Sequence, residues 1–246
     1  GKYTNVPVTP KSEMFGPFWD HDFYNIHLDK NADMIKKIIR SIYRFPPASH
    51  SDDNTLHIHI RGDDAITDMK NNGMVQPPCQ YYSDQIEKKQ WNKIIIISED
   101  KKNPCVDFIL NKYENAQYNK NTLDDDISQI LSAKYICIGR GTFMPALTLF
   151  MPNLQELHYG DDGDDRMHYF LEVFNKNKVT IHREYENYYK KVQSTDDISD
   201  VKKLMRDWQH PSTTDVIESY TNIIPNIIHF IYGLKPENSN NFPFIY

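Results

Sequence analysis

The sequence has little cysteine, no long hydrophobic run and no excess of basic charge, and each absence argues against a class of protein or a cellular compartment. Three cysteines occur in 246 residues, and no two of them have the spacing of metal ligands. We therefore expect unpaired thiols and a cytoplasmic, reducing compartment. No apolar stretch is long enough for a transmembrane helix. The net charge of -6 argues against a nucleic-acid binder that relies on a broad basic face.

The residues that are present predict a folded α/β domain. Hydrophobic residues make up 39% of the chain and charged residues 25%, enough for a core. Apolar patterns predict strands at 55–60, 93–97, 135–138 and 154–159, with helices at 81–89, 104–113, 124–132 and 144–150 between or after them. This alternation is typical of a parallel, Rossmann-like sheet flanked by helices. A further apolar stripe predicts a core-facing helix over 31–43.

The stretch 55–64, T-L-H-I-H-I-R-G-D-D, is the most informative part of the chain. Leu56, Ile58 and Ile60 alternate with two histidines, so a strand with two unlike faces is expected. Arg61 follows at the carboxyl end of this strand, where ligands bind in open α/β sheets. A guanidinium there matches the shape of a phosphate. The same pattern is also compatible with a strand that ends in a surface ion pair.

Two more predicted strands end in polar residues. The strand 93–97 is followed by Ser98, Glu99 and Asp100, and the strand 135–138 by Gly-Arg-Gly-Thr-Phe at 139–143. Because the carboxyl ends of parallel strands share one edge, we expect these residues to converge on a nucleotide-type site. The glycine spacing fits neither the dinucleotide fingerprint nor a P-loop.

His59-Ile60-Arg61-Gly62-Asp63-Asp64 resembles the His-x-Arg-x-x-Asp motif of the fucosyltransferase superfamily, which covers α1,2-, α1,6- and protein O-fucosyltransferases. Three further segments resemble that superfamily in order and spacing: the proline-tyrosine segment 75–82, the strand 94–100 and the helix-strand-loop 127–142. The resemblance spans roughly residues 55–160.

The resemblance implies the nucleotide-sugar-binding half of a GT-B glycosyltransferase that uses GDP-fucose without a metal. Arg61 would bind the diphosphate, and His59 and Asp64 would shape the site as its further catalytic residues. The implied nucleotide pocket consists of Arg61, Ser98, Asp100, Gly141, Thr142 and Phe143. A general base would deprotonate an acceptor hydroxyl of a glycan or protein, with Asp63, Asp64 and His57 as candidates.

Two departures from the family keep an alternative open. Many fucosyltransferases carry a second arginine where Gly62 stands. Its absence, together with the short amino-terminal region of about 55 residues, favours a non-catalytic module that binds a glycan or a partner. An unrelated phosphate-binding hydrolase is a weaker alternative, because the sequence has no Gly-x-Ser-x-Gly elbow.

The expected domain organisation has four parts. Residues 1–54 form a lead-in and a reduced amino-terminal region, 55–192 the Rossmann-like domain, and 193–222 a helix and linker. Residues 224–233 resemble the opening strand of a GT-A glycosyltransferase, so 223–246 are expected to begin a second such domain of a longer, fused protein. The acidic run 161–165 is expected to be a solvated surface turn rather than a metal loop.

Overall fold

The computed structural model describes residues 2–3, 28–48, 52–62, 64–67, 75–141, 143–160, 171, 175 and 178–209. The chain divides into two compact units, one of residues 1–2 and 43–217 and one of residues 3–42 and 218–246. The proposed acidic turn at 161–165 and the tail at 223–246 lie outside the described residues.

The larger unit is built on a six-stranded sheet in which all neighbouring strands are parallel. In chain order its strands are β3 (Thr55–His59), β4 (Lys93–Ile97), β5 (Ala116–Tyr118), β6 (Tyr135–Ile138), β7 (Glu156–Gly160) and β8 (Val179–His182). The spatial order is β5-β4-β3-β6-β7-β8. The first strand of the sheet along the chain, β3, lies in its middle. The next two strands, β4 and β5, extend the sheet to one side of β3, and β6, β7 and β8 extend it to the other side. This doubly wound arrangement confirms the predicted Rossmann-like α/β fold.

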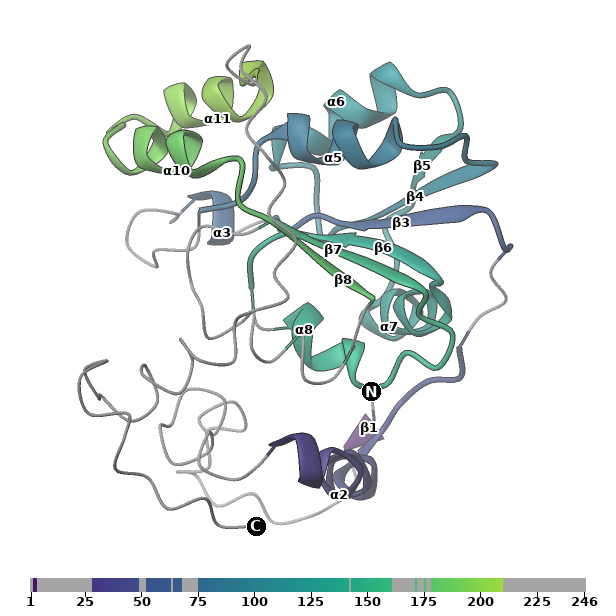
Figure 1. Ribbon diagram of the computed structural model, residues 1–246. Coiled ribbons are helices and arrows are strands. Elements are labelled where there is room, and N and C mark those ends of the chain that lie inside the picture. Colours follow the sequence, from purple (N-terminus) through teal and green to yellow (C-terminus); the bar gives the residue numbers. More distant parts are fainter. Residues whose placement is uncertain are drawn as a thin grey trace, which may run out of the picture. The chain divides into compact units, whose positions relative to one another are not determined.

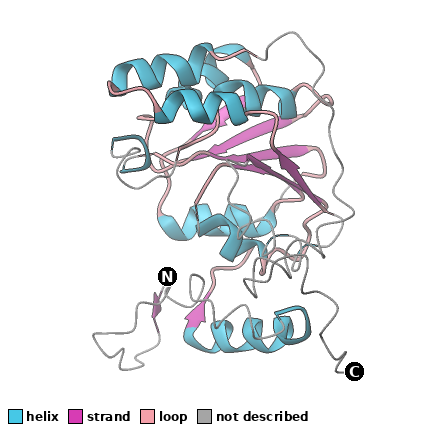
Figure 2. Cartoon of the chain, turned by 60° about the vertical axis from the view of Figure 1, so that its left-hand side comes forward, coloured by secondary structure: helices cyan, strands magenta, loops and turns pink. Residues whose placement is uncertain are grey.

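Helices cover both faces of the sheet (Figures 1 and 2). One face carries α5 (Cys79–Ile86), α6 (Pro104–Lys112), α10 (Glu186–Gln193) and α11 (Ile198–Asp207), and the other carries α7 (Leu123–Ser132) and α8 (Phe143–Thr148). The one-turn helix α3 (Asp64–Thr67) follows β3, and the short strands β1 (Lys2–Tyr3) and β2 (Tyr43–Arg44) are not part of the sheet.

The apolar side chains that alternate along β3 point into the main core of the larger unit. Leu56, Ile58 and Ile60 are fully buried in a core shared with α5, α6, α10 and α11. This core is rich in tyrosine, with Tyr81 and Tyr188 fully buried in it. A polar tip on a large apolar body lets tyrosine fill a core and still bond a main-chain group.

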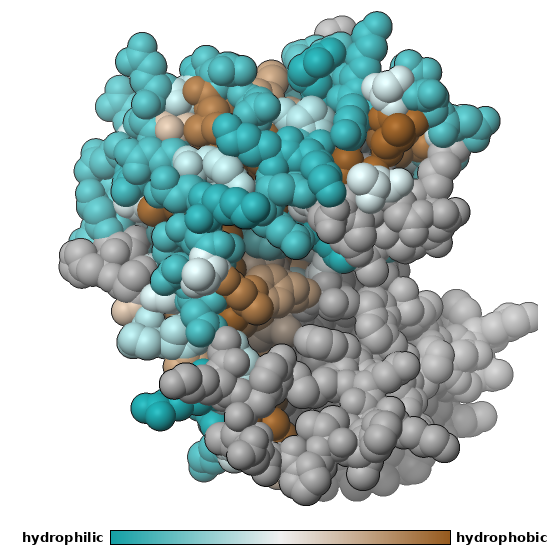
Figure 3. Space-filling model, turned by 180° about the vertical axis from the view of Figure 1, so that it is seen from behind, coloured by the Kyte–Doolittle hydropathy of each residue, from teal (hydrophilic) through white to brown (hydrophobic). Residues whose placement is uncertain are grey.

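Seen from behind, the described surface is mostly hydrophilic, with small hydrophobic patches between the polar residues (Figure 3).

The smaller unit contains α2 (Leu28–Ile42). The apolar stripe correctly predicted this helix, but three of its members, Met34, Ile38 and Ile42, are 39% to 51% exposed. The expectation that the stripe faces a core is therefore wrong for these residues. A spacing of 3.6 residues indicates a helix, and it does not show whether another element covers the stripe.

The cysteines differ from the prediction. Cys79, at the start of α5, forms a disulfide with Cys105 in α6, and only the buried Cys137 is free. The expected set of three unpaired thiols is wrong, because packing of two helices brings together residues 26 positions apart. The cysteine count then no longer supports a reducing compartment, and cytoplasmic location stays a prediction. In the described part of the chain, no helix is long and apolar enough to cross a membrane.

Candidate functional site at the switch point of the sheet

The candidate site lies where the chain reverses its direction of winding, between the neighbouring strands β3 and β6. His59 and Ile138 are partners at the carboxyl ends of these strands. The Ile60 N–H still donates to the Ile97 carbonyl at 2.9 Å, so regular pairing stops just before Arg61. In doubly wound sheets a ligand crevice opens at this position.

Arg61 and Gly141 lie against each other across the two strand ends. Arg61 is half-buried, and Gly141 has a φ of +149°, which residues with side chains rarely adopt. A Cβ atom on Gly141 would lie 3.2 Å from Nη1 of Arg61. Glycine therefore gives the guanidinium room to approach the loop after β6.

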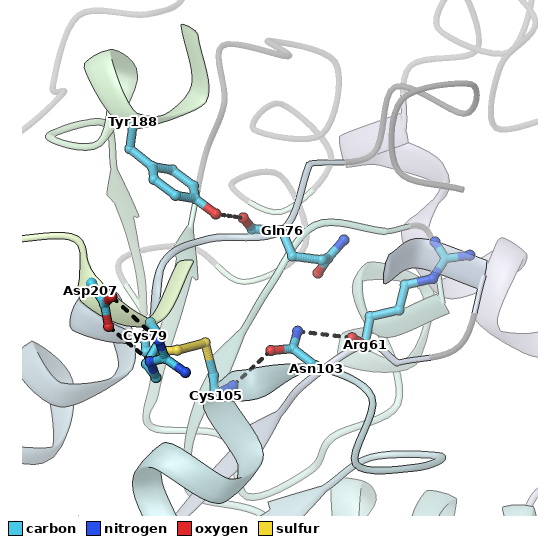
Figure 4. Close-up of a disulfide and its surroundings, with 8 residues drawn as sticks. Arg61, Gln76, Cys79, Asn103, Cys105, Tyr188 and Asp207 are labelled. Atoms are coloured by element: carbon cyan, nitrogen blue, oxygen red, sulfur yellow. Dashed lines mark hydrogen bonds and ion pairs between the residues drawn. A yellow bond between two sulfur atoms is a disulfide. The ribbon is translucent and has the colours of Figure 1, made fainter. Parts of the chain in front are cut away.

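Buried side chains hold the carbonyl groups of this loop from one side. The Tyr81 hydroxyl donates to the Ile138 carbonyl at 3.1 Å. Nε2 of Gln76 donates to the Arg140 carbonyl, also at 3.1 Å. The Tyr188 hydroxyl donates to the Gln76 carbonyl at 3.0 Å, as Figure 4 shows. Because N–H and C=O point in opposite directions in a trans peptide, the N–H groups of Gly139 and Gly141 point away from these side chains.

The loop fits closely over its support. A Cβ atom on Gly139 would lie 2.8 Å from Oε1 of Gln76 and 2.9 Å from the Tyr82 hydroxyl. Among the described residues, the Gly141 N–H donates no hydrogen bond to another main-chain group. An N–H group that points outward beside a cation can contribute to an anion site.

The polar residues after β4 also lie at this edge. Ser98 is buried and its hydroxyl donates to the Asp100 carbonyl at 2.8 Å. Oδ1 of Asp100 accepts from the Lys102 N–H at 2.9 Å. The carboxylate packs against Gly62, where a Cβ atom would overlap Oδ1 and lie 3.1 Å from Cγ of Asp100. A side chain at position 62 would therefore require the Asp100 carboxylate to move.

The two histidines of β3 are held in their neutral form. Burial, and after it the charge of Arg61, lowers the pKa of His59 to about 4. The His59 ring lies 6.0 Å from that of Phe143, which is 36% exposed. Burial also lowers the pKa of His57 to about 4, and this side chain is 1% exposed. His57 cannot meet an acceptor hydroxyl there, which removes it from the candidate bases.

The acidic candidates are less fully defined. Asp64 is the first residue of α3, but its side chain is not described, and Asp63 and Thr142 lie outside the described residues. Within the described ranges, no cluster of three or more metal-ligating side chains occurs.

Sequence reasoning missed the residues that support the site. The side chains of Tyr81, Gln76 and Tyr188 bond main-chain groups that are 57, 64 and 112 positions away, respectively. No local pattern signals such pairs. Arg140 belongs to the Gly-Arg-Gly segment expected at this edge, where it is a second positively charged residue, but no role of its own was predicted for it. The Gly-Arg-Gly spacing was the available signal for it.

Comparisons with protein families, with curated proteins and with solved structures found no significant match. The fold defines the chain as a Rossmann-like α/β protein, and a function has to be argued from the site.

Proposed function

We propose that the chain is a glycosyltransferase that binds the diphosphate of a nucleotide sugar, GDP-fucose, at the switch point of the sheet. It transfers the sugar with inversion to a hydroxyl of a glycan or protein. The observation that carries the proposal is the position of Arg61 against Gly141 at the adjacent ends of β3 and β6. The resemblance of residues 59–64 to the fucosyltransferase motif supports the donor assignment.

The proposed chemistry needs charge stabilisation on the leaving group. Two parallel N–H bonds from the Arg61 guanidinium would bind the diphosphate as negative charge develops on it. The outward N–H group of Gly141 would add a donor on the same side. His59, neutral and half-buried, would form the wall beneath the arginine, and Asp64 or Asp63 would be the general base. No metal is required in this scheme.

Calorimetry tests the donor site directly. We expect GDP and GDP-fucose to bind equally well with and without Mn²⁺. Arg61→Ala should weaken binding by about 10- to 100-fold, the equivalent of roughly 1.5 to 3 kcal/mol for charge-assisted hydrogen bonds. Arg206→Ala is the matched control, because this exposed arginine pairs with Asp207 on α11. Tighter binding of UDP would overturn the fucose assignment, and no binding of any nucleotide would overturn the donor site.

A non-catalytic binding module is the second candidate, and Gly62 favours it. Gly62 offers no second guanidinium for a diphosphate, and the Asp100 carboxylate lies against it instead. Slow hydrolysis of GDP-fucose, measured as GDP release, separates the two candidates. A catalyst should release GDP at a rate that falls in Arg61→Ala, whereas a binding module should bind the donor and release none.

A further inference from the structure

Asn103 stands at the junction between α6 and the candidate site. It is fully buried and immediately precedes Pro104, the first residue of α6. Its Oδ1 accepts a hydrogen bond from the Cys105 N–H at 3.0 Å, as an N-cap residue does. Proline at the first helical position completes a common helix start.

The same side chain makes a second bond, to a residue 42 positions earlier. Nδ2 of Asn103 donates to the Arg61 carbonyl at 3.1 Å. Figure 4 shows the carbonyl of Arg61 facing Asn103 while the guanidinium points away from it. The Ile60 N–H makes a sheet-type bond to Ile97, and Asn103 holds the main chain at the next residue.

We infer that Asn103 is a positioning residue of the anion site, which holds the main chain of Arg61 so that the guanidinium faces Gly141. The inference rests on the proposed function. Its physical basis is the choice of an amide at this N-cap. Asparagine, aspartate and serine cap helices about equally well. Only asparagine can accept from the helix and also donate an N–H to the Arg61 carbonyl. The α6 start that carries this residue is tied to α5 two positions later by the disulfide of Cys105.

Two substitutions keep the cap and remove the bond to the Arg61 carbonyl. Aspartate has no donor, and the shorter serine hydroxyl cannot reach both the Cys105 N–H and the Arg61 carbonyl. Asn103→Asp retains the size of the side chain, and Asn103→Ser retains its neutrality, so an effect shared by both does not come from added charge. We expect both to weaken GDP binding at least tenfold, measured by calorimetry well below the unfolding temperature. Thr122→Ala is the control for lost stability, because it removes the N-cap bond of α7 on the opposite face. It should leave GDP affinity unchanged. Wild-type affinity in both Asn103 variants would overturn the inference.

A measurement without ligand separates this inference from the proposed function. The ¹³C resonance of the Arg61 carbonyl reports its hydrogen bond, and it should shift in both Asn103 variants but not in Thr122→Ala. If the wild-type protein binds no GDP, the proposed function is wrong, and the carbonyl shift still decides whether Asn103 holds this main chain. If the Arg61 carbonyl resonance has the wild-type position in both variants, Asn103 does not hold this main chain.

Discussion

The disulfide between Cys79 and Cys105 leads to a prediction with a calculable size. The two residues are 26 positions apart in the sequence. Closing a loop of this length in the unfolded chain removes entropy worth about 3.5 kcal/mol at 25 °C. Reduction should therefore destabilise the larger unit by roughly this amount. With a denaturant dependence of about 2 kcal/mol/M, the urea midpoint should fall by roughly 1.5 to 2 M.

The assay compares urea unfolding of oxidised and reduced protein by far-ultraviolet circular dichroism. Protein equilibrated with oxidised glutathione should show one free thiol in denaturant, the buried Cys137. The double variant Cys79→Ala/Cys105→Ala should unfold near the reduced midpoint and should not respond to reductant. Cys137→Ala should keep its response. Three free thiols after oxidation, or equal midpoints with and without reductant, would refute the reasoning.

Three further predictions concern the site and its support. Gly141→Ala should weaken GDP binding about tenfold and destabilise the fold by roughly 1 to 3 kcal/mol, because a side chain at a φ of +149° is strained and would crowd Arg61; unchanged calorimetry and urea melts would contradict this. Tyr81→Phe should cost about 0.5 to 1.5 kcal/mol in urea melts by removing a buried hydrogen bond to the Ile138 carbonyl, whereas Tyr113→Phe, whose hydroxyl bonds exposed Glu87, should cost under about 0.5 kcal/mol; equal losses would refute the difference. Stability should fall as pH drops from about 6.5 to 4, because the unfolded chain binds protons that the folded chain, with histidine pKa values of about 4 at 57 and 59, does not. Each of these histidines should contribute roughly 1.4 kcal/mol per pH unit in that window, and a flat profile of urea midpoints would disprove it.

Local sequence patterns determined most of the sheet and its flanking helices. The alternation in β3 and the apolar run of β4 identified these strands, since the period of two and the isoleucine content reflect side-chain placement along a strand. Parallel pairing then followed from the alternation of strands and helices, which put the ends of β3, β4 and β6 on one edge. The strand β5 was missed because its three residues, A-Q-Y, show no such period.

The convergence of Arg61 and Gly141 was predictable from the sequence for the same reason. Each lies within three residues of a strand end, and the order of parallel strands brings those ends together. The sequence predicted the glycine turn after β6, but it did not predict how closely Gly141 approaches the Arg61 guanidinium.

The tertiary structure alone decided what holds the site in place. Asn103, Gln76, Tyr81 and Tyr188 bond main-chain groups far away in the sequence, and Cys79 meets Cys105 only because α5 and α6 pack on the same face. It also decided that Asp100 occupies the space beside Gly62. These contacts depend on distances between elements, which the period of a pattern does not encode. The sequence by itself therefore determined which residues reach the edge of the sheet, and close packing in three dimensions determined how they are held there.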